Sequence, residues 1–292
     1  NISREFYELA NEEQLTFFPD KMLKGRLDQI DHSIFIIAET DKKELEGISP
    51  KCIMKRQESF KPYLDWREEK ENKGDFFWTL AMYATEEMAK EANMSLEEYW
   101  QEIIKACYLE DVDPVETWRG IFEEVDRVKD KLNKLHIEKV RVEAENTDIE
   151  IKLGDNRQWL GGSGHNIPSF EVFISPDFRG TNGHIQFTEP LYSHGHLIKD
   201  VYLEFKAGKI TKATASVGQD VLKEMISVKG ADQIGEFSLT DARLSKITKF
   251  MVWPTRILIL VIHQQSQKSN GKQWVLTIQS STLILSRLQK GK

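Results

Sequence analysis

The spacing of hydrophobic residues changes along the chain, from helical periods in the first half to two-residue alternation in the second. Two short apolar runs, 33–40 and 77–85, have polar flanks, which is typical of buried parallel strands. After Asp113 and Pro114, apolar residues recur near helical spacing to about His136, which predicts an amphipathic helix. Strands that alternate with helices predict a parallel sheet in this half of the chain.

Further helices are predicted around these strands. The hydrophobic periods place them at 3–14, 18–31 and 49–71, and Ser95 with Glu98 forms a capping-box pattern ahead of another. No Gly-x-Gly-x-x-Gly or P-loop pattern follows either predicted strand. The first half therefore gives no indication of a site for a dinucleotide or a nucleoside triphosphate.

From about residue 138 the hydrophobic pattern has a period of two. Segments 139–145 and 148–154 alternate apolar and polar residues, as half-buried antiparallel strands do. The same alternation continues at 184–191, 200–210 and 211–217. These strands, with the short helix expected at 219–227, predict a β-rich α+β fold.

The expected fold class is mixed α/β, in three parts. Residues 1–140 are an N-terminal α/β domain with a parallel sheet, and residues 141–251 are an incomplete β-rich α+β domain. Residues 252–292 are a tail of different composition, with six Lys or Arg and no Asp or Glu, although the chain has 47 acidic residues. Its apolar run at 256–262 is too short to span a bilayer.

The composition narrows the classes of protein to consider. The 292 residues are 40% hydrophobic and 30% charged, which is ordinary for a globular protein. A net charge of −7 argues against a nucleic-acid partner. No apolar run approaches the roughly 18 residues of a membrane span, so no membrane partner is expected. The two cysteines, Cys52 and Cys107, make no disulfide framework, and we expect a cytoplasmic protein.

Most chemistry-bearing residues are ambiguous when they are read alone. The Gly-Gly-Ser-Gly run at 161–164 has the backbone for an anion site, but a flexible glycine turn is the more common meaning of such a run. His194 and His196 have the spacing of a metal chelate, although paired histidines in a polar loop usually lie on the surface. His165 and His184 have no carboxylate motif beside them.

Two glutamates differ from these residues because they interrupt apolar segments. Glu171 lies between Phe170 and Val172, and Glu236 lies directly before Phe237. A carboxylate at a buried strand position is unfavourable unless it is paired or bound to a metal. The two residues are therefore a candidate pair for a hard divalent cation, and the alternative is two edge-strand glutamates that point outward.

Three long segments, 159–205, 209–226 and 230–251, closely resemble the aminopeptidase T / aminopeptidase S family, and segment 105–118 is also similar. The resemblance covers about residues 1–251. It implies a metal-dependent aminopeptidase that releases N-terminal residues from peptides by hydrolysis. It also implies an N-terminal α/β domain, a C-terminal domain with two divalent metal ions (zinc, cobalt or magnesium), and a cytoplasmic homodimer around an enclosed active site.

The resemblance assigns metal-binding roles to both glutamates. The ligand of the family's Pro-x-x-Glu-Val-Phe motif falls on Glu171, and the ligand of its Gly-Glu motif falls on Glu236. The family also has a histidine in an Asn-Thr-His-type motif, a nearby tyrosine and a later His-Thr-Asp. None of these follows Met251, and the sequence around His263 does not match. We therefore expect this chain to bind metal weakly and to have little or no peptidase activity.

We interpret the tail as the product of a frameshift near codon 252. From Asn270 onward, the possible codons in a shifted frame permit a stretch with the missing His-Thr-Asp. The family's first strand and helix are also expected to be absent before Asn1. A continuous open frame in the nucleotide sequence, with no insertion or deletion near codon 252, would refute the frameshift.

Two other functions remain open at this point. A catalytically inactive, degenerate copy would keep a peptide-binding or dimerising surface without turnover. An α/β binding protein without metal is the third possibility. The metal content distinguishes the inactive copy from an active enzyme, since an active member is expected to hold about two ions per chain.

Overall fold

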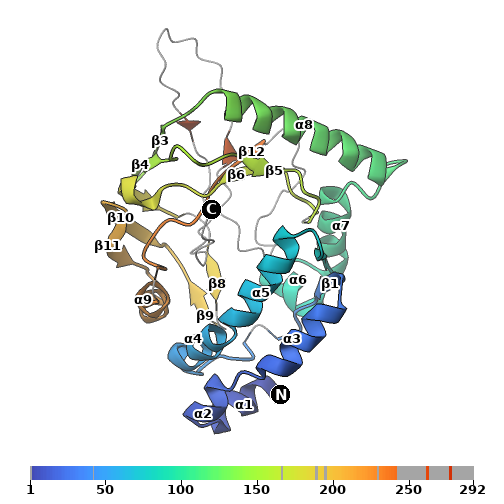
Figure 1. Ribbon diagram of the computed structural model, residues 1–292, viewed down its shortest axis with the longest axis vertical. Coiled ribbons are helices and arrows are strands. Elements are labelled where there is room, and N and C mark those ends of the chain that lie inside the picture. Colours follow the sequence, from blue (N-terminus) through green and yellow to red (C-terminus); the bar gives the residue numbers. More distant parts are fainter. Residues whose placement is uncertain are drawn as a thin grey trace.

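The computed structural model describes residues 2–41, 43–165, 167–187, 190–193, 196–228, 230–241, 261–262 and 276–277. Figure 1 shows its helices and strands. The helices are α1 Ile2–Leu9, α2 Glu12–Thr16, α3 Asp20–Gln29, α4 Pro50–Ser59, α5 Lys61–Asn72, α6 Glu86–Glu91, α7 Leu96–Ala106, α8 Pro114–Lys134 and α9 Gln219–Ser227, with a 3₁₀ turn at Phe178–Gly180. The strands are β1 His32–Ile37, β2 Phe77–Met82, β3 Lys139–Ala144, β4 Thr147–Lys152, β5 Leu160–Gly161, β6 Glu171–Ile174, β7 Asn182–Gln186, β8 Leu191–Ser193, β9 His196–Ile198, β10 Tyr202–Lys206, β11 Lys209–Thr214, β12 Phe237–Asp241, β13 Val261–Ile262 and β14 Leu276–Thr277. This mixture of helices and sheets confirms the expected α/β class.

The helix boundaries follow local capping chemistry. The region predicted as one helix at 3–14 is two, because the Asn11 side chain accepts a hydrogen bond from Gln14 N and starts α2 with a capping box. The predicted helix at 49–71 is also divided, and α5 has its proline in the first turn after Phe60. The Ser95–Glu98 capping box is present as predicted and begins α7.

Strands β1 and β2 pair in parallel, with His32 opposite Phe77 and Ile37 opposite Met82, which confirms the predicted parallel sheet. The prediction that both strands are buried is wrong. Ile34, Phe35 and Ile36 are 72%, 65% and 61% exposed. Consecutive strand residues point to opposite faces, so both faces of β1 are open in the part of the chain that the structure describes.

The second half contains the larger sheets. One has the order β11-β10-β7-β4-β3-β14, and its pairs are antiparallel except for β14 beside β3. The other has the order β13-β12-β6-β5, in which β6 pairs antiparallel with both β12 and β5. The antiparallel pairing confirms what the two-residue alternation predicted.

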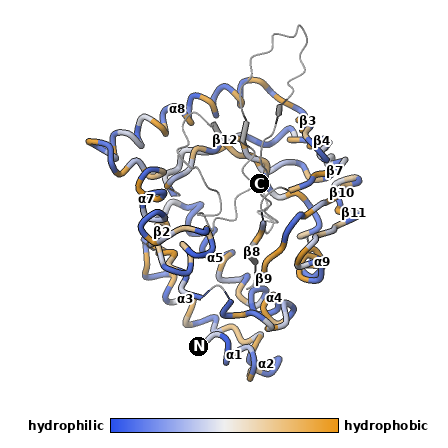
Figure 2. The backbone as a smooth tube through the Cα atoms, turned by 180° about the vertical axis from the view of Figure 1, so that it is seen from behind, coloured by the Kyte–Doolittle hydropathy of each residue, from blue (hydrophilic) through white to orange (hydrophobic). Residues whose placement is uncertain are grey.

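One hydrophobic core joins these sheets to α8. The helix shows alternating hydrophobic and hydrophilic residues along its length (Figure 2), and buries Trp118, Ile121 and Val125 in this core. Figure 1 shows α8 running alongside β5 and β6. Asn133 of α8 hydrogen-bonds both the backbone N–H and the carbonyl of Trp159, which fixes the segment that enters β5. The domain boundary near residue 140 stays a prediction, and α8, which precedes it, packs on strands that follow it.

The tail lies largely outside the described residues. Only two short strands of it are described, β13 beside β12 and β14 beside β3. The expectations for residues 252–292, including the frameshift, are therefore not tested by the structure.

Candidate metal centre

The two candidate glutamates lie at the starts of neighbouring strands of the four-stranded sheet. Glu171 is the first residue of β6, and Glu236 directly precedes β12. In the ladder, Glu171 is opposite Thr240 and Phe173 is opposite Ser238. Side chains alternate between the faces of a strand, so Glu236 shares one face with Ser238, Thr240 and Glu171.

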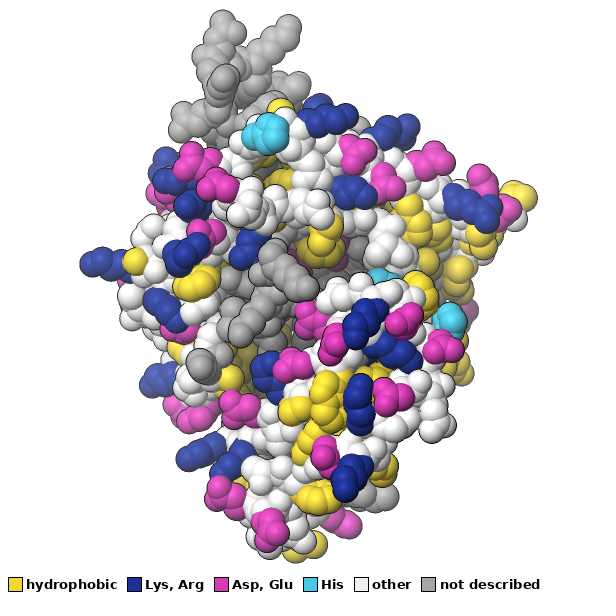
Figure 3. Space-filling view, in the orientation of Figure 1, with side chains coloured by type: hydrophobic (Ala, Val, Ile, Leu, Met, Phe, Trp, Pro, Cys, Tyr) yellow, Lys and Arg dark blue, Asp and Glu magenta, His cyan; other side chains and the backbone are white. Residues whose placement is uncertain are grey.

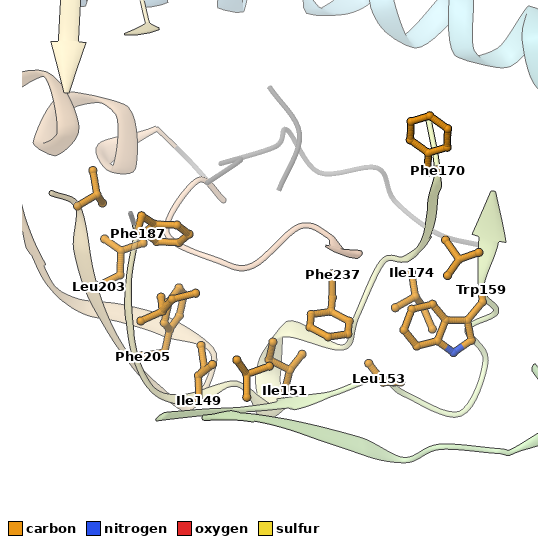
Figure 4. Close-up of a cluster of buried hydrophobic side chains, with 14 of the residues drawn as sticks. Ile149, Ile151, Leu153, Trp159, Phe170, Ile174, Phe187, Leu203, Phe205 and Phe237 are labelled. Carbon is orange, nitrogen blue, oxygen red and sulfur yellow. The ribbon is translucent and has the colours of Figure 1, made fainter. Parts of the chain in front are cut away.

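The opposite face of the same ladder is apolar. Val172, Ile174 and Phe237 are buried in the main core. Figure 4 shows Phe237 and Ile174 beside Trp159, and the rings of Phe237 and Trp159 lie edge to face with centroids 6.0 Å apart. This packing fixes the backbone of both strands, and therefore also the positions from which the polar side chains project.

The polar face is buried as well. Glu171 is 9% exposed, and Ser238 and Thr240 are also buried. The Ser169 hydroxyl lies 3.5 Å from Glu171 Oε1, which is a long contact. Within the described part of the chain, Glu171 Oε2 and Thr240 Oγ1 are buried and have no hydrogen-bond partner. Buried polar atoms are normally paired, so this face has the character of a binding site rather than of a packed core.

The electrostatics of the pair favour a cation. Burial and, to a smaller extent, the charge of Glu236 raise the pKa of Glu171 to about 7, although hydrogen bonds from Ser169 and Ser238 partly oppose the change. Burial also raises the pKa of Glu236. Burial thus disfavours both carboxylates as anions, and the charge of Glu236 adds to this effect at Glu171. A positive charge between them would reverse both effects.

The donor set fits a divalent ion in type but not in number. Carboxylate oxygens are ligands for zinc and for magnesium, and Glu171 Oε2 has no hydrogen-bond partner among the described residues. A catalytic zinc usually has three protein ligands. Among the described residues, no group of three or more His, Cys, Asp or Glu side chains is placed to hold a metal. Within the described part of the chain, two glutamates are fewer ligands than a catalytic zinc usually has.

The glycine run at 161–164 has a structural reason. Gly161 lies in β5 with φ +154°, and a Cβ atom there would be 2.5 Å from the carbonyl oxygen of Glu171. Only glycine permits β5 to approach β6 this closely. At Gly162 an added Cβ would lie 3.5 Å from Asp126 Oδ1, an atom that pairs with Lys129. The run therefore positions β6.

The histidines do not join the glutamates among the described residues. His165 stacks on Trp78 with ring centroids 4.6 Å apart, and His184 lies 5.8 Å from the Tyr202 ring. His196 is in the β8–β9 hairpin, where its Nε2 atom is buried and has no hydrogen-bond partner in the described part of the chain. His194 lies outside the described residues, so the His194–His196 chelate stays untested.

The hydroxyl groups of this site were missed by the sequence reasoning. Ser238 and Thr240 continue the two-residue alternation that begins at Glu236, in the run Glu-Phe-Ser-Leu-Thr. A strand prediction at 236–240 would have placed all three polar residues on one face.

Comparison with known proteins identifies the relatives of this chain. The model of the thermophilic metalloprotease (M29) family matches residues 1–258. Aminopeptidase AmpS of Bacillus subtilis (strain 168) is 29% identical over 256 residues, covering 82% of this chain and 62% of that protein. Aminopeptidase PepS of Streptococcus thermophilus is 32% identical over 179 residues, covering 56% and 43%.

A solved structure shows the same fold. Wild-type AmpT from Thermus thermophilus superposes with a TM-score of 0.70 at 21% sequence identity, covering 83% of this chain and 64% of that one. The chain thus spans less than two thirds of the length of each of these relatives.

Proposed function

The chain belongs to the thermophilic metalloprotease (M29) family, and we propose that it is a metal-dependent aminopeptidase of reduced activity. Its substrates would be peptides with a free N-terminus, from which it removes the first residue. The curated relatives are named aminopeptidases, which supports this class of reaction. The observation that carries the proposal is the buried Glu171 with the half-buried Glu236, whose charge acts on it. Among the described residues, Glu171 Oε2 has no hydrogen-bond partner.

In this proposal the two glutamates hold divalent cations. Zinc, cobalt or magnesium ions, two of them in the complete family site, would polarise a water molecule and the scissile carbonyl. The chain itself contributes orientation and the exclusion of water. Gly161 lets β5 press against β6, and hydroxyls of Ser169 and Ser238 hydrogen-bond the Glu171 carboxylate. The described residues supply two ligands, which is the reason for expecting weak binding.

The remaining expectations are also part of the proposal. We place the enzyme in the cytoplasm as a homodimer, by analogy with its family. No described helix is long and apolar enough to cross a membrane. On the face seen in Figure 3, acidic and basic side chains are interspersed and form no basic stripe. That distribution is unlike the footprint of a nucleic-acid-binding protein.

The test is release of an arylamine from an amino-acid arylamide, with cobalt or zinc added to the purified full chain. Slow release that requires the metal and disappears in Glu171→Gln is the expected result. Exposed Glu145 offers a matched control, and Glu145→Gln should leave the rate unchanged. Release that does not depend on metal, or that survives Glu171→Gln, would contradict the proposal.

The inactive-copy alternative predicts a different outcome of the same experiment. No release would be seen at any metal concentration, while peptide binding or self-association persists. The observation that favours the inactive copy is that the family match ends at residue 258 of the 292-residue chain. Metal content of about two ions per chain would speak against it.

A further inference from the structure

Thr240 is a buried residue of the candidate site that the proposed function does not use. It is opposite Glu171 in the β6–β12 ladder, and the two side chains project from the same face. Side chains directly opposite each other in an antiparallel pair have Cβ atoms about 5 Å apart. Thr240 is 7% exposed, so water has little access to its hydroxyl.

Both neighbours have an oxygen atom without a partner among the described residues. These atoms are Thr240 Oγ1 and Glu171 Oε2. An ionised carboxylate can only accept hydrogen bonds, whereas a threonine hydroxyl can donate one. A hydrogen bond from Thr240 to Glu171 is therefore a pairing that would satisfy both atoms.

We propose that Thr240 is a positioning residue, whose hydroxyl orients the Glu171 carboxylate for a divalent cation. This inference rests on the proposed metal site. Hydrogen-bond partners of metal ligands fix the ligand's orientation, and their loss typically weakens metal binding by about 10- to 100-fold. Ser169 and Ser238 already hydrogen-bond the same carboxylate. Thr240 adds a third hydroxyl, from strand β12, which Glu236 directly precedes.

The chain provides a matched control for this role. Thr181 is fully buried, and its Oγ1 atom likewise has no partner among the described residues. It precedes β7, which belongs to the other large sheet. Thr181→Val thus removes the same kind of buried hydroxyl without touching the candidate site.

The experiment measures Co²⁺ binding to the full chain, by visible absorption and calorimetry up to millimolar concentration. Thr240→Val should weaken binding by about 10-fold or more and change the Co²⁺ absorption bands. Thr240→Ser, which keeps the hydroxyl, should bind within about twofold of the unchanged chain, and Thr181→Val should bind equally well. Without metal, Thr240→Val and Thr181→Val should shift the melting temperature by similar amounts. If Thr240→Val does not fold, Thr240→Ala is used in its place.

Two outcomes separate the inference from the function on which it rests. If Glu171→Gln weakens Co²⁺ binding but Thr240→Val does not, the positioning role is wrong and the metal site stands. If Glu171→Gln binds Co²⁺ as the unchanged chain does, the metal site itself is wrong, and the role of Thr240 is overturned with it.

Discussion

Two pairs of strands in this molecule invert the usual distribution of polar and apolar side chains. In the β1–β2 pair, large apolar residues such as Ile34 and Phe35 are exposed. In the β6–β12 pair, Glu171 and Thr240 are buried on one face while Val172 and Phe237 fill the core on the other. In both cases the apolar residues favour strand formation. Whether each strand face is buried or exposed depends on which other elements pack on it.

The difference also separates two kinds of unsatisfied surface. Exposed apolar residues lose the favourable free energy of burial, which is about 25 cal/mol for each Å² that stays in water. A buried carboxylate instead has a direct electrostatic penalty, which appears as the raised pKa of Glu171. Only the buried carboxylate requires a group of a particular charge, a cation, to remove its penalty.

The largest expected effect contrasts one phenylalanine from each strand pair. Phe237→Ala should lower the free energy of unfolding by about 3–5 kcal/mol, because Phe237 is 1% exposed and its removal leaves a cavity. Phe77→Ala on β2 should change it by about 0.5 kcal/mol, since Phe77 is half exposed. Urea denaturation of both variants measures the difference. Equal losses would show that the two strand pairs are equally well packed.

The next effect depends on pH. Glu171 has a pKa of about 7 in the folded chain, against 4.5 for the unperturbed group. The protonated group suits its buried position, so its contribution to stability is complete below about pH 4.5. It is lost as the pH rises through 7, at a cost of roughly 3 kcal/mol, because each pKa unit corresponds to about 1.4 kcal/mol.

Glu171→Gln checks this sign in the presence of a chelator. At pH 8 the variant should be more stable than the unchanged chain by up to roughly 3 kcal/mol, and at pH 4 the two should be equal within about 0.5 kcal/mol. Glu145→Gln, at an exposed position, should show no such pH dependence. A variant that is less stable at pH 8 would mean that the carboxylate is satisfied by a partner.

The smallest effect concerns the exposed apolar strand. Phe35→Thr and Ile36→Thr should each change the free energy of unfolding by about 0.5 kcal/mol or less, because both side chains already face water. Both should reduce the fluorescence of bound anilinonaphthalene sulfonate, a dye that binds exposed apolar surface. A loss of several kcal/mol would show that β1 is covered in solution.

The sequence predicted the elements better than it predicted their surroundings. The apolar runs identified β1 and β2 and their parallel pairing, but not their exposure, because a run of apolar residues does not specify whether a second layer covers it. Period-two alternation identified β3 and β4 as antiparallel partners. Alternation works there because one face meets the core and the other meets water.

The candidate site shows the same limit. Glu171 was recognised because a carboxylate inside an apolar run is unusual, and the structure places it in a buried strand. Thr240 was not recognised, because its importance comes from being opposite Glu171 across the ladder, and a single sequence does not give strand register. The metal-binding roles of Glu171 and Glu236 remain a prediction of the family resemblance and of their shared electrostatics.

The central claim is that Glu171 and Glu236 act together on a divalent cation, and a Co²⁺ titration of the full chain tests it most directly. Glu171→Gln and Glu236→Gln should each weaken Co²⁺ binding by at least about 10-fold, because losing even the hydrogen-bond partner of a metal ligand typically weakens binding by that factor. Glu145→Gln should have no effect. Unchanged Co²⁺ binding in both glutamine variants would contradict the account.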